Sequence, residues 1–462
     1  MIAVRLLRRL LLFAGLALLL FAPASAAGPV LDPSFGSGGR AIGSAPPNAA
    51  FTGFAAVRSP DGRIYVDQGP GLRAFLPDGT PDRSFGAGGS VVFPEVRWPV
   101  YFTVADVAVD GQGRVLVAGT WITNDPGPEE PSQVATVIRY LPDGQLDPGF
   151  ADGGVLRTTF GLPKPHDESG LSPASADHVA VRLAGLGIDG SGRIVLAGSY
   201  AERTVKCPNG GSYEMPLAFL ARFGPDGRPD GSFGQGGLAL QPGLGLPTDL
   251  QVDAAGASTF TATPPGCGLP REGALARLDA TGSPDLGFGS GGRRGLAEPP
   301  ARLTTAPNGR LLVLFSPRRF NDSGRGHSIT VVRRFNGSGA LDRSFARRGA
   351  AGIRLPGRSS LFGAIAVDPR GRVLLSGAVN LPRAKPRTDP IRRFVLARLR
   401  SDGSRDLSFG SRGTVTTPFG RRSRANARAI LLEPSGRIVL AGSLGASYLV
   451  NETGFALVRY RT

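Results

Sequence analysis

The stretch Leu31-Asp32-Pro33-Ser34-Phe35-Gly36-Ser37-Gly38-Gly39 decides the fold, because its aspartate and its phenylalanine recur along the chain of 462 residues. The aspartate returns at Asp82, Asp147, Asp230, Asp285, Asp342 and Asp406. The phenylalanine follows each time three residues later, at Phe85, Phe150, Phe233, Phe288, Phe345 and Phe409. Recurrence of one motif over nearly the whole chain indicates a repeat architecture.

Two further motifs recur in register with the first. The clearest copy of one is Gly192-Arg193-Ile194-Val195-Leu196-Ala197-Gly198, and the others begin at Gly62, Gly113, Gly256, Gly309, Gly371 and Gly436. The other motif is Leu220-Ala221-Arg222-Phe223 followed by Pro225-Asp226-Gly227, and it recurs near Ala74, Arg139, Arg277, Arg334, Arg398 and Arg459. The constant order of the motifs divides the chain into seven units.

Each unit reads as four short strands, here called A to D, joined by tight glycine-containing turns. The chain has 68 Gly and 40 Pro but only 7% aromatic residues, which favours many short strands over long helices. Four-stranded units of this size suit the blades of a propeller. We therefore expect an all-β, seven-bladed β-propeller with four-stranded blades. The N-terminal strand, at about residues 37–43, should complete the last blade, formed by residues 426–462, and so remove a free sheet edge.

The first residues have the pattern of an export signal. Arg5, Arg8 and Arg9 precede an apolar run at residues 10–21, and Ala24-Ser25-Ala26 supplies small residues for cleavage. We expect a signal peptide at 1–26 and one propeller domain at 27–462, located outside the cytoplasm without a transmembrane anchor. An uncleaved anchor is the alternative, and the export route stays open.

The three motifs resemble the delta-60 repeat, a family of exported bacterial proteins. The similarity is carried by the Asp-Gly-x-x-Asp-x-Ser-Phe-Gly stretch, the Gly-Arg-Ile-Val-Leu-Ala-Gly strand and the Leu-Ala-Arg-Phe strand. The resemblance implies a β-propeller and export, but no agreed activity and no catalytic residue. The chain departs from the pattern at Ala74, at Ala257-Ser258-Thr259 and at Ala346-Arg347-Arg348.

The recurrent side chains are expected to be structural. The seven phenylalanines should wedge between neighbouring blades, and each motif aspartate should accept backbone N–H groups of the following turn. Six of the seven units carry an arginine upstream of this aspartate, which predicts an Arg–Asp pair in those blades.

The longest insertions fall on one side of the expected ring, at the B–C and D–A connections, which we call the loop face. They lie at residues 121–133, 161–177, 201–215, 317–326 and 380–390. Insertions gathered on one face are typical of a binding surface, although drift in loop length would produce them too.

Charge is unevenly distributed over this face. Residues 293–462 hold 32 basic and 9 acidic side chains, a net charge of +23, whereas residues 1–292 have a net charge of −6. The candidate anion-binding or partner-binding residues are Arg318, Arg319, Arg383, Lys385, Arg387, Arg421, Arg422 and Arg424. Acidic residues gather in the second and third units, at Asp125, Glu129, Glu130, Asp167, Glu168, Glu202 and Glu214. A GC-rich gene would also raise the arginine content, but it would not explain this asymmetry.

The chain has two cysteines, Cys207 and Cys267, in the B–C connections of adjacent units. An oxidising compartment predicts a disulfide between them, and two free thiols are the alternative. Two cysteines without an adjacent histidine make a poor metal site, so no metal and no cofactor are expected.

The sequence favours a secreted binding module that contacts an anionic polysaccharide, a wall polymer or a protein through its loop face. Nucleic acid is not expected as a partner outside the cytoplasm. The alternatives are a scaffold without a ligand and a hydrolase or lyase at the mouth of the propeller. Because His166, His178 and His327 lack a nucleophile signature nearby, no catalytic residue and no enzymatic activity are expected.

Overall fold

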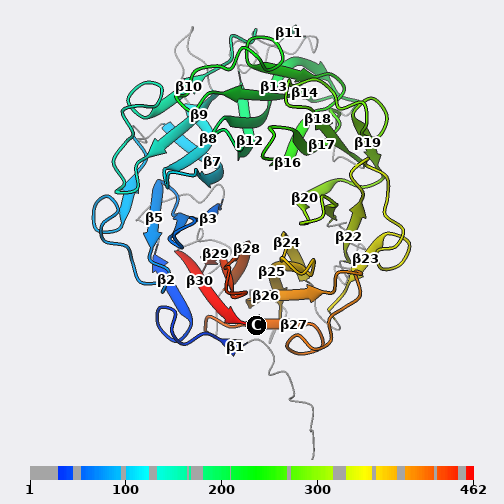
Figure 1. The fold of residues 1–462 in the computed structure, drawn as a ribbon. Helices are drawn as coiled ribbons and strands as arrows, with labels where there is room; N and C mark the ends of the chain where they lie inside the picture. Colours follow the sequence, from blue (N-terminus) through cyan, green and yellow to red (C-terminus); the bar gives the residue numbers. More distant parts are fainter. Residues whose placement is uncertain are drawn as a thin grey trace, which may run out of the picture.

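A computed structural model describes residues 30–44, 54–94, 100–123, 133–163, 166–167, 180–208, 210–267, 272–315, 329–355, 360–381, 391–420, 424–445 and 454–462. The regular secondary structure of these residues is all β-strand, and the strands are arranged as a ring (Figure 1). The expected signal peptide at 1–26 lies outside the described residues.

Four sheets contain four antiparallel strands each. The first two are formed by β3 (Ala56–Arg58), β4 (Ile64–Asp67), β5 (Gly71–Phe75) and β6 (Ser90–Val92), and by β7 (Val100–Val109), β8 (Val115–Thr123), β9 (Gln133–Tyr140) and β10 (Val155–Thr158). The other two are formed by β16 (Leu246–Val252), β17 (Ser258–Thr263), β18 (Gly273–Leu278) and β19 (Arg293–Leu296), and by β20 (Pro300–Thr305), β21 (Leu311–Phe315), β22 (Thr330–Phe335) and β23 (Ala350–Ile353).

A fifth sheet has the same four-stranded plan with one strand added. Its blade is formed by β12 (Val181–Ile188), β13 (Ile194–Lys206), β14 (Ser212–Phe223) and β15 (Leu238–Gln241). The short strand β11 (His166–Asp167) pairs in parallel with β13 at Arg203 and Thr204.

The sixth sheet has nine strands. One antiparallel group consists of β24 (Ser360–Val367), β25 (Val373–Asn380), β26 (Arg392–Leu399) and β27 (Thr414–Thr417). The other consists of β28 (Arg424–Leu432), β29 (Ile438–Gly445) and β30 (Gly454–Arg461), with β1 (Val30–Leu31) and β2 (Arg40–Ser44) paired to β30. A single parallel pair, Arg392 with Arg424, joins the two groups.

The expectation of seven separate four-stranded blades is therefore wrong. Five blades of four strands form separate sheets, one of which carries β11 as well, and the remaining nine strands form one sheet. The sequence gives no sign of this junction. The repeat motifs encode pairing within a unit, whereas a bridge between the first residues of β26 and β28 depends on how closely two neighbouring groups approach.

The two ends of the described chain lie in the same sheet (Figure 1). β2 pairs antiparallel with β30 from Arg40 opposite Val458 to Ser44 opposite Gly454, and β1 pairs with the end of β30. The outer edge of β30 is thus paired with strands from the other end of the chain and is not free to pair with another β-strand.

The innermost strands surround the axis of the ring. Neighbouring inner strands contact one another in the closed series β3, β7, β12, β16, β20, β24, β28 and again β3 (Figure 1). Most of these strands contain a β-bulge near their middle, for example between Val104 and Asp106 and between Pro247 and Asp249. The middle strands of each blade are buried on both faces, as in β8 and β21, because other blades cover them on either side.

The motif phenylalanines lie between consecutive blades. All seven rings are fully buried. A Cβ placed on Gly79 would lie 2.8 Å from the ring of Phe35, and one on Gly403 would lie 2.7 Å from that of Phe345. These glycines also have φ values of +81° and +85°, so the Asp-Gly turn of one repeat needs glycine both for its conformation and for the ring of the preceding repeat.

The motif arginine links the same two blades through polar contacts. In Arg334, Nε donates to Asp342 Oδ2 at 2.8 Å, and Nη1 donates to the carbonyl of Ser401 in the next blade at 2.6 Å. The guanidinium carbon lies 4.6 Å from the centroid of the Phe345 ring. The pKa of Asp342 is held below its usual value, chiefly by the hydrogen bond from the Ser344 hydroxyl.

The other repeats with a motif arginine contain the same kind of Arg–Asp pair. The pairs are Arg139–Asp147, Arg222–Asp230, Arg277–Asp285, Arg398–Asp406 and Arg459–Asp32, and the last of these connects the two ends of the chain. In the repeat where Ala74 replaces the arginine, Arg63 in the turn before β4 lies 3.3 Å from Asp82 and is the cation of that pair.

Replacing Arg139 by alanine is expected to lower the free energy of unfolding by about 1.5–3 kcal/mol, because it removes the charged hydrogen bond to the buried carboxylate of Asp147 and leaves that group only the longer ion pair with Arg114, at 3.6 Å. Arg228→Ala is the matched control, since the Arg228 side chain is 88% exposed, and it should change stability by less than about 1 kcal/mol. Denaturant titration of both variants tests this. Equal effects would mean that the buried pair does not hold the blades together.

Candidate functional site

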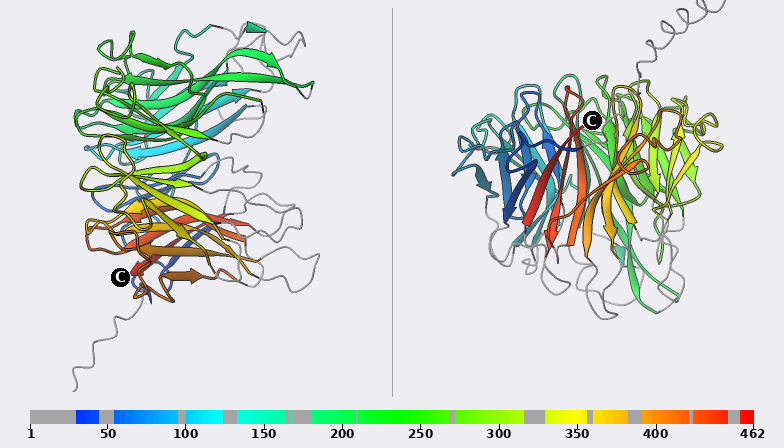
Figure 2. Two further views of the ribbon diagram at one scale, coloured as in Figure 1. Left: turned by 90° about the vertical axis from the view of Figure 1, so that its right-hand side faces the viewer. Right: turned by 90° about the horizontal axis from the view of Figure 1, so that it is seen from below.

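One hairpin projects beyond the neighbouring strands on one face of the ring (Figure 2). β13 and β14 remain paired as far as Lys206 opposite Ser212, with an irregularity between Ala201 and Arg203. The expectation of a loop insertion at residues 201–215 is wrong, because most of this segment belongs to the two long strands β13 and β14. The sequence Cys207-Pro-Asn-Gly-Gly211 between two alternating segments was the available signal of a hairpin turn.

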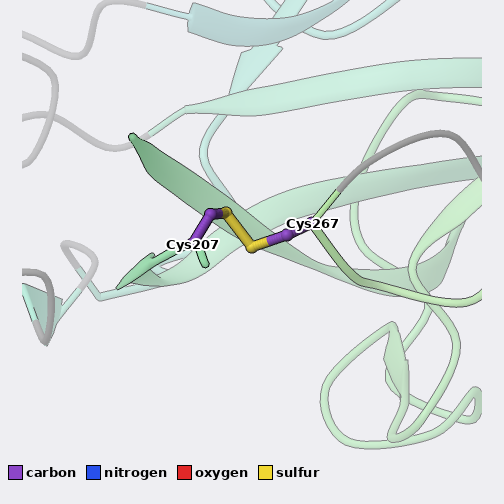
Figure 3. The surroundings of a disulfide bond; sticks show 2 residues. All are labelled: Cys207 and Cys267. Carbon is purple, nitrogen blue, oxygen red and sulfur yellow. A yellow bond between two sulfur atoms is a disulfide. The ribbon is translucent and has the colours of Figure 1, made fainter. Parts of the chain in front are cut away.

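The predicted disulfide between Cys207 and Cys267 is confirmed. Cys207 lies at the tip of the β13–β14 hairpin, and Cys267 follows β17 in the next blade (Figure 3). Their Cα atoms are 5.8 Å apart and they are separated by 60 residues in the sequence. Closing a loop of this length stabilises a fold by about 4 kcal/mol in the chain-entropy model, and here it also fixes the hairpin relative to its neighbour.

A cavity of about 430 Å³ lies at the base of this hairpin, beside the beginning of β12 and the beginning of β16. Inner strands begin on the loop face, so the cavity opens on that face. Its polar lining is supplied by Arg182, Ser199, Tyr200, Thr204, Tyr213 and Glu214. A concave site with aromatic side chains and a few polar groups is the usual form of a small-ligand site.

The charged groups of this cavity pair with one another. Arg182 Nη2 lies 3.9 Å from Glu214 Oε2, and Arg182 Nε donates to Gln133 Oε1 of β9 at 2.8 Å. The Arg182 side chain is nevertheless 59% exposed, so it can still contact a ligand. The cavity therefore presents both a positive and a negative group and has little net charge of its own.

The neutral polar groups add hydrogen-bonding capacity. Burial raises the pKa of Tyr200, and the nearby Glu202 carboxylate raises it further, so the phenol keeps its proton at neutral pH. Thr204 Oγ1 is buried and has no hydrogen-bond partner among the described residues. A buried hydroxyl without a partner is costly in the free protein and is satisfied when a ligand supplies the partner.

Most of the predicted anion-binding residues lie outside the described residues. These are Arg318, Arg319, Arg383, Lys385, Arg387, Arg421 and Arg422. Arg424 is the first residue of β28, at the end of an inner strand on the loop face, and pairs with Gly445 and Arg392. Among the acidic residues, Glu202 and Glu214 lie on the hairpin, and Glu214 lines the cavity. Of the three histidines, His166 lies in β11, whereas His178 and His327 are outside the described residues.

Sequence reasoning missed the tyrosines and Arg182 of the cavity. Tyr200 and Tyr213 belong to the extended part of the hairpin, and Leu246 of the cavity comes from the next blade. Their convergence depends on the pairing of β13 with β14 and on the neighbouring blade.

Two carboxylates on the inner strands form a second group of polar residues. Asp106 of β7 accepts hydrogen bonds from Val107 N at 2.8 Å and from Leu186 N of β12 at 3.4 Å. Asp249 of β16 accepts from Leu250 N at 2.9 Å and from Leu303 N of β20 at 2.8 Å. Each carboxylate thus links its own inner strand to a neighbour.

Burial raises the pKa of Asp106 to about 7, and the charge of Asp249 adds to this effect. Burial also raises the pKa of Asp249, against the opposing charge of Arg302 on β20. Asp106 can exchange a proton near neutral pH, but neither carboxylate lines the cavity at the hairpin. Their hydrogen bonds indicate that these two carboxylates mainly join neighbouring inner strands.

The stability of the protein should therefore depend on pH through Asp106. Its folded-state pKa is higher than the value of about 3.8 in the unfolded chain, so its contribution is complete at acidic pH and is lost as the pH rises toward 7. Asp106→Asn should reduce the fall in unfolding free energy between pH 4 and pH 7 by up to about 1.4 kcal/mol per pH unit. Urea titrations at several pH values measure this slope, with Asp226→Asn at an exposed turn as the control. An unchanged slope in Asp106→Asn would contradict the prediction.

Among the described residues, no three His, Cys, Asp or Glu side chains come together as a metal site. No helix in the described ranges is long and apolar enough to span a membrane.

Comparison with known proteins supports the repeat assignment at the level of the fold. The model of a family described as "Domain of unknown function (DUF5122) beta-propeller" matches residues 113–150 and 387–409. This supports a propeller-repeat family, whereas the delta-60 name is not confirmed. The search of curated proteins found no match.

Several solved structures align with the chain over most of its length. A putative gluconolactonase is 12% identical, with a TM-score of 0.35 and coverage of 94% of this chain and 97% of that one. An α-L-arabinanase from Penicillium chrysogenum is 10% identical, with a TM-score of 0.38 and coverage of 91% and 97%. A luciferin-regenerating enzyme is 11% identical, with a TM-score of 0.35 and coverage of 81% and 99%.

The expectation that the chain is not an enzyme does not stand, because these three aligned structures carry the names of enzymes. At these identities and TM-scores the similarity gives the chain no activity and no substrate. The chain is an all-β propeller with repeats similar to the DUF5122 beta-propeller family.

Proposed function

We propose that the chain is an exported binding module whose loop face holds an anionic, sugar-containing polymer of the cell envelope. One sugar unit occupies the cavity at the base of the β13–β14 hairpin, and the arginines of the C-terminal part of the chain attract the charges along the polymer. The observation that carries the proposal is the chemistry of the cavity, in which two tyrosines adjoin the paired side chains of Arg182 and Glu214.

This combination of groups suits a polyhydroxylated ligand. Tyrosine offers an apolar ring face together with a polar hydroxyl, and so can pack against a sugar ring while forming a hydrogen bond. Arg182 donates hydrogen bonds, Glu214 accepts them, and the buried Thr204 hydroxyl needs a partner. Because Arg182 and Glu214 compensate each other, the cavity selects hydroxyl groups rather than a high charge.

The anionic character of the ligand is inferred from the sequence. The net charge of +23 over residues 293–462 comes almost entirely from arginine, which forms paired hydrogen bonds with carboxylate and phosphate groups. Such a charge raises the rate of encounter with a polyanion and makes the affinity depend on salt.

Binding to purified anionic envelope polysaccharide tests the two parts separately. Tyr213→Ala and Arg182→Ala should each weaken binding about tenfold at every salt concentration, because they remove contacts inside the cavity. The triple variant Arg421→Ala/Arg422→Ala/Arg424→Ala should weaken binding at low salt and approach the wild type at high salt.

Two results would count against the proposal. If the wild type binds equally well at low and high salt, the ligand is not an anionic polymer. If the cavity variants bind with full affinity, the cavity is not the sugar subsite. Failure of the wild type to bind any envelope polymer would favour a scaffold without a ligand.

Export is tested by the mass of the mature protein. Cleavage after Ala26 would give a chain that begins at Ala27, and the disulfide between Cys207 and Cys267 should then be complete in the exported fraction. A full-length chain starting at Met1 in that fraction would show that the N-terminal segment is not removed.

A further inference from the structure

The turns between the first and second strands of several blades are held by one aspartate. Asp368 Oδ1 accepts hydrogen bonds from the backbone N–H groups of Arg370 at 3.0 Å and Arg372 at 2.9 Å, and Asp368 Oδ2 accepts one from Arg372 Nε at 2.6 Å. Asp110 and Asp189 make the corresponding three contacts in their own turns. One carboxylate thus binds two backbone donors and one guanidinium.

The turn between β20 and β21 has the same backbone without this carboxylate. It reads Ala306-Pro307-Asn308-Gly309-Arg310, whereas the turn between β24 and β25 reads Asp368-Pro369-Arg370-Gly371-Arg372. Gly309 N donates to Ala306 O at 2.9 Å and Gly371 N donates to Asp368 O at 2.8 Å. The two glycines have φ values of +74° and +75°. Ala306 therefore removes an anion from a turn that is otherwise unchanged.

The N–H donors of this turn find only weaker acceptors in place of the missing carboxylate. Arg310 N donates to Asn308 Oδ1 at 3.3 Å, and Arg310 Nε lies 3.3 Å from Asp342 Oδ2. That oxygen already accepts a hydrogen bond from Arg334 Nε at 2.8 Å. One carboxylate is thus shared by two guanidinium groups.

A cavity of about 470 Å³ lies at this position, between the turn and the next blade. Its lining residues include Ala306, three arginines, which are Arg310, Arg334 and Arg370, and the acidic residue Asp402. Asp342 pairs with Arg310 and Arg334, so this group of residues carries three positive and two negative charges. Arg334 is held in place by Ser401 O and by Ser344 Oγ at 3.2 Å, so it cannot turn away from the cavity without losing these bonds.

We propose that this cavity binds a small oxyanion, the carboxylate or phosphate group of a small molecule, in place of the missing aspartate carboxylate. The backbone N–H groups of Asn308 and Arg310 and the Arg310 guanidinium take the roles that their counterparts have toward Asp368, and Arg370 covers the open side. Arginine and backbone N–H groups are the usual donors to such anions. The site lies at the opposite ends of the strands from the hairpin cavity, so it is independent of the function proposed above.

Titration of the full-length protein with inorganic phosphate and, separately, with acetate at constant ionic strength tests the site by calorimetry. The wild type should bind at least one of the two anions saturably, and the more tightly bound anion identifies the ligand group. Ala306→Asp should weaken this binding at least tenfold, because the new carboxylate occupies the site, and should also raise the melting temperature. Arg370→Ala should weaken binding through loss of a cation, and Arg228→Ala, an exposed arginine elsewhere, should leave it unchanged.

The two variants keep the proposal testable even if one of them folds poorly. Loss of binding in either folded variant supports the site. The proposal is overturned if neither anion binds the wild type saturably, or if both variants bind as the wild type does.

Discussion

The junction between consecutive repeats is the contact on which the ring depends. A fully buried phenylalanine from one repeat lies against a turn glycine of the next, and the guanidinium that covers the same ring donates to a carbonyl of that turn. Apolar packing, cation–π attraction and charge-assisted hydrogen bonds therefore act at one place, and each repeat is incomplete without its neighbour. A blade alone would expose its phenylalanine and would leave Nη1 of the arginine without the carbonyl acceptor of the next blade.

Much of this junction could be predicted from the sequence, because its residues recur. The aspartates, phenylalanines and most of the arginines stand at constant positions in the units. The repeats within one chain can therefore be aligned with one another, as homologous sequences would be. The disulfide was predictable for a different reason, since the only two cysteines fall in equivalent connections of adjacent repeats.

The features that could not be predicted arise where the repeats differ. The bridge of Arg392 to Arg424, which merges two groups of strands, depends on spatial approach rather than on a motif. The long β13–β14 hairpin appeared as an insertion, and its tyrosines gained a shared cavity only once the strands paired in register. The inner carboxylates Asp106 and Asp249 were also missed, because the sequence shows neither the β-bulges beside them nor the neighbouring strand whose backbone N–H group each one binds. The lack of a carboxylate at Ala306 becomes informative only by comparison with Asp110, Asp189 and Asp368, because the structure shows the hydrogen bonds that these aspartates form in their turns.

The pairing of β2 with β30 sets the order in which the molecule can be completed. β2 leaves the ribosome long before β30, so its partner does not exist while the intervening repeats are being made. Local hairpins within a repeat can form early, but the closing ladder requires a contact across more than 400 residues, as does the ion pair of Arg459 with Asp32. Ring closure therefore cannot precede the synthesis of β30, and until then the N-terminal strand lacks its pairing partner.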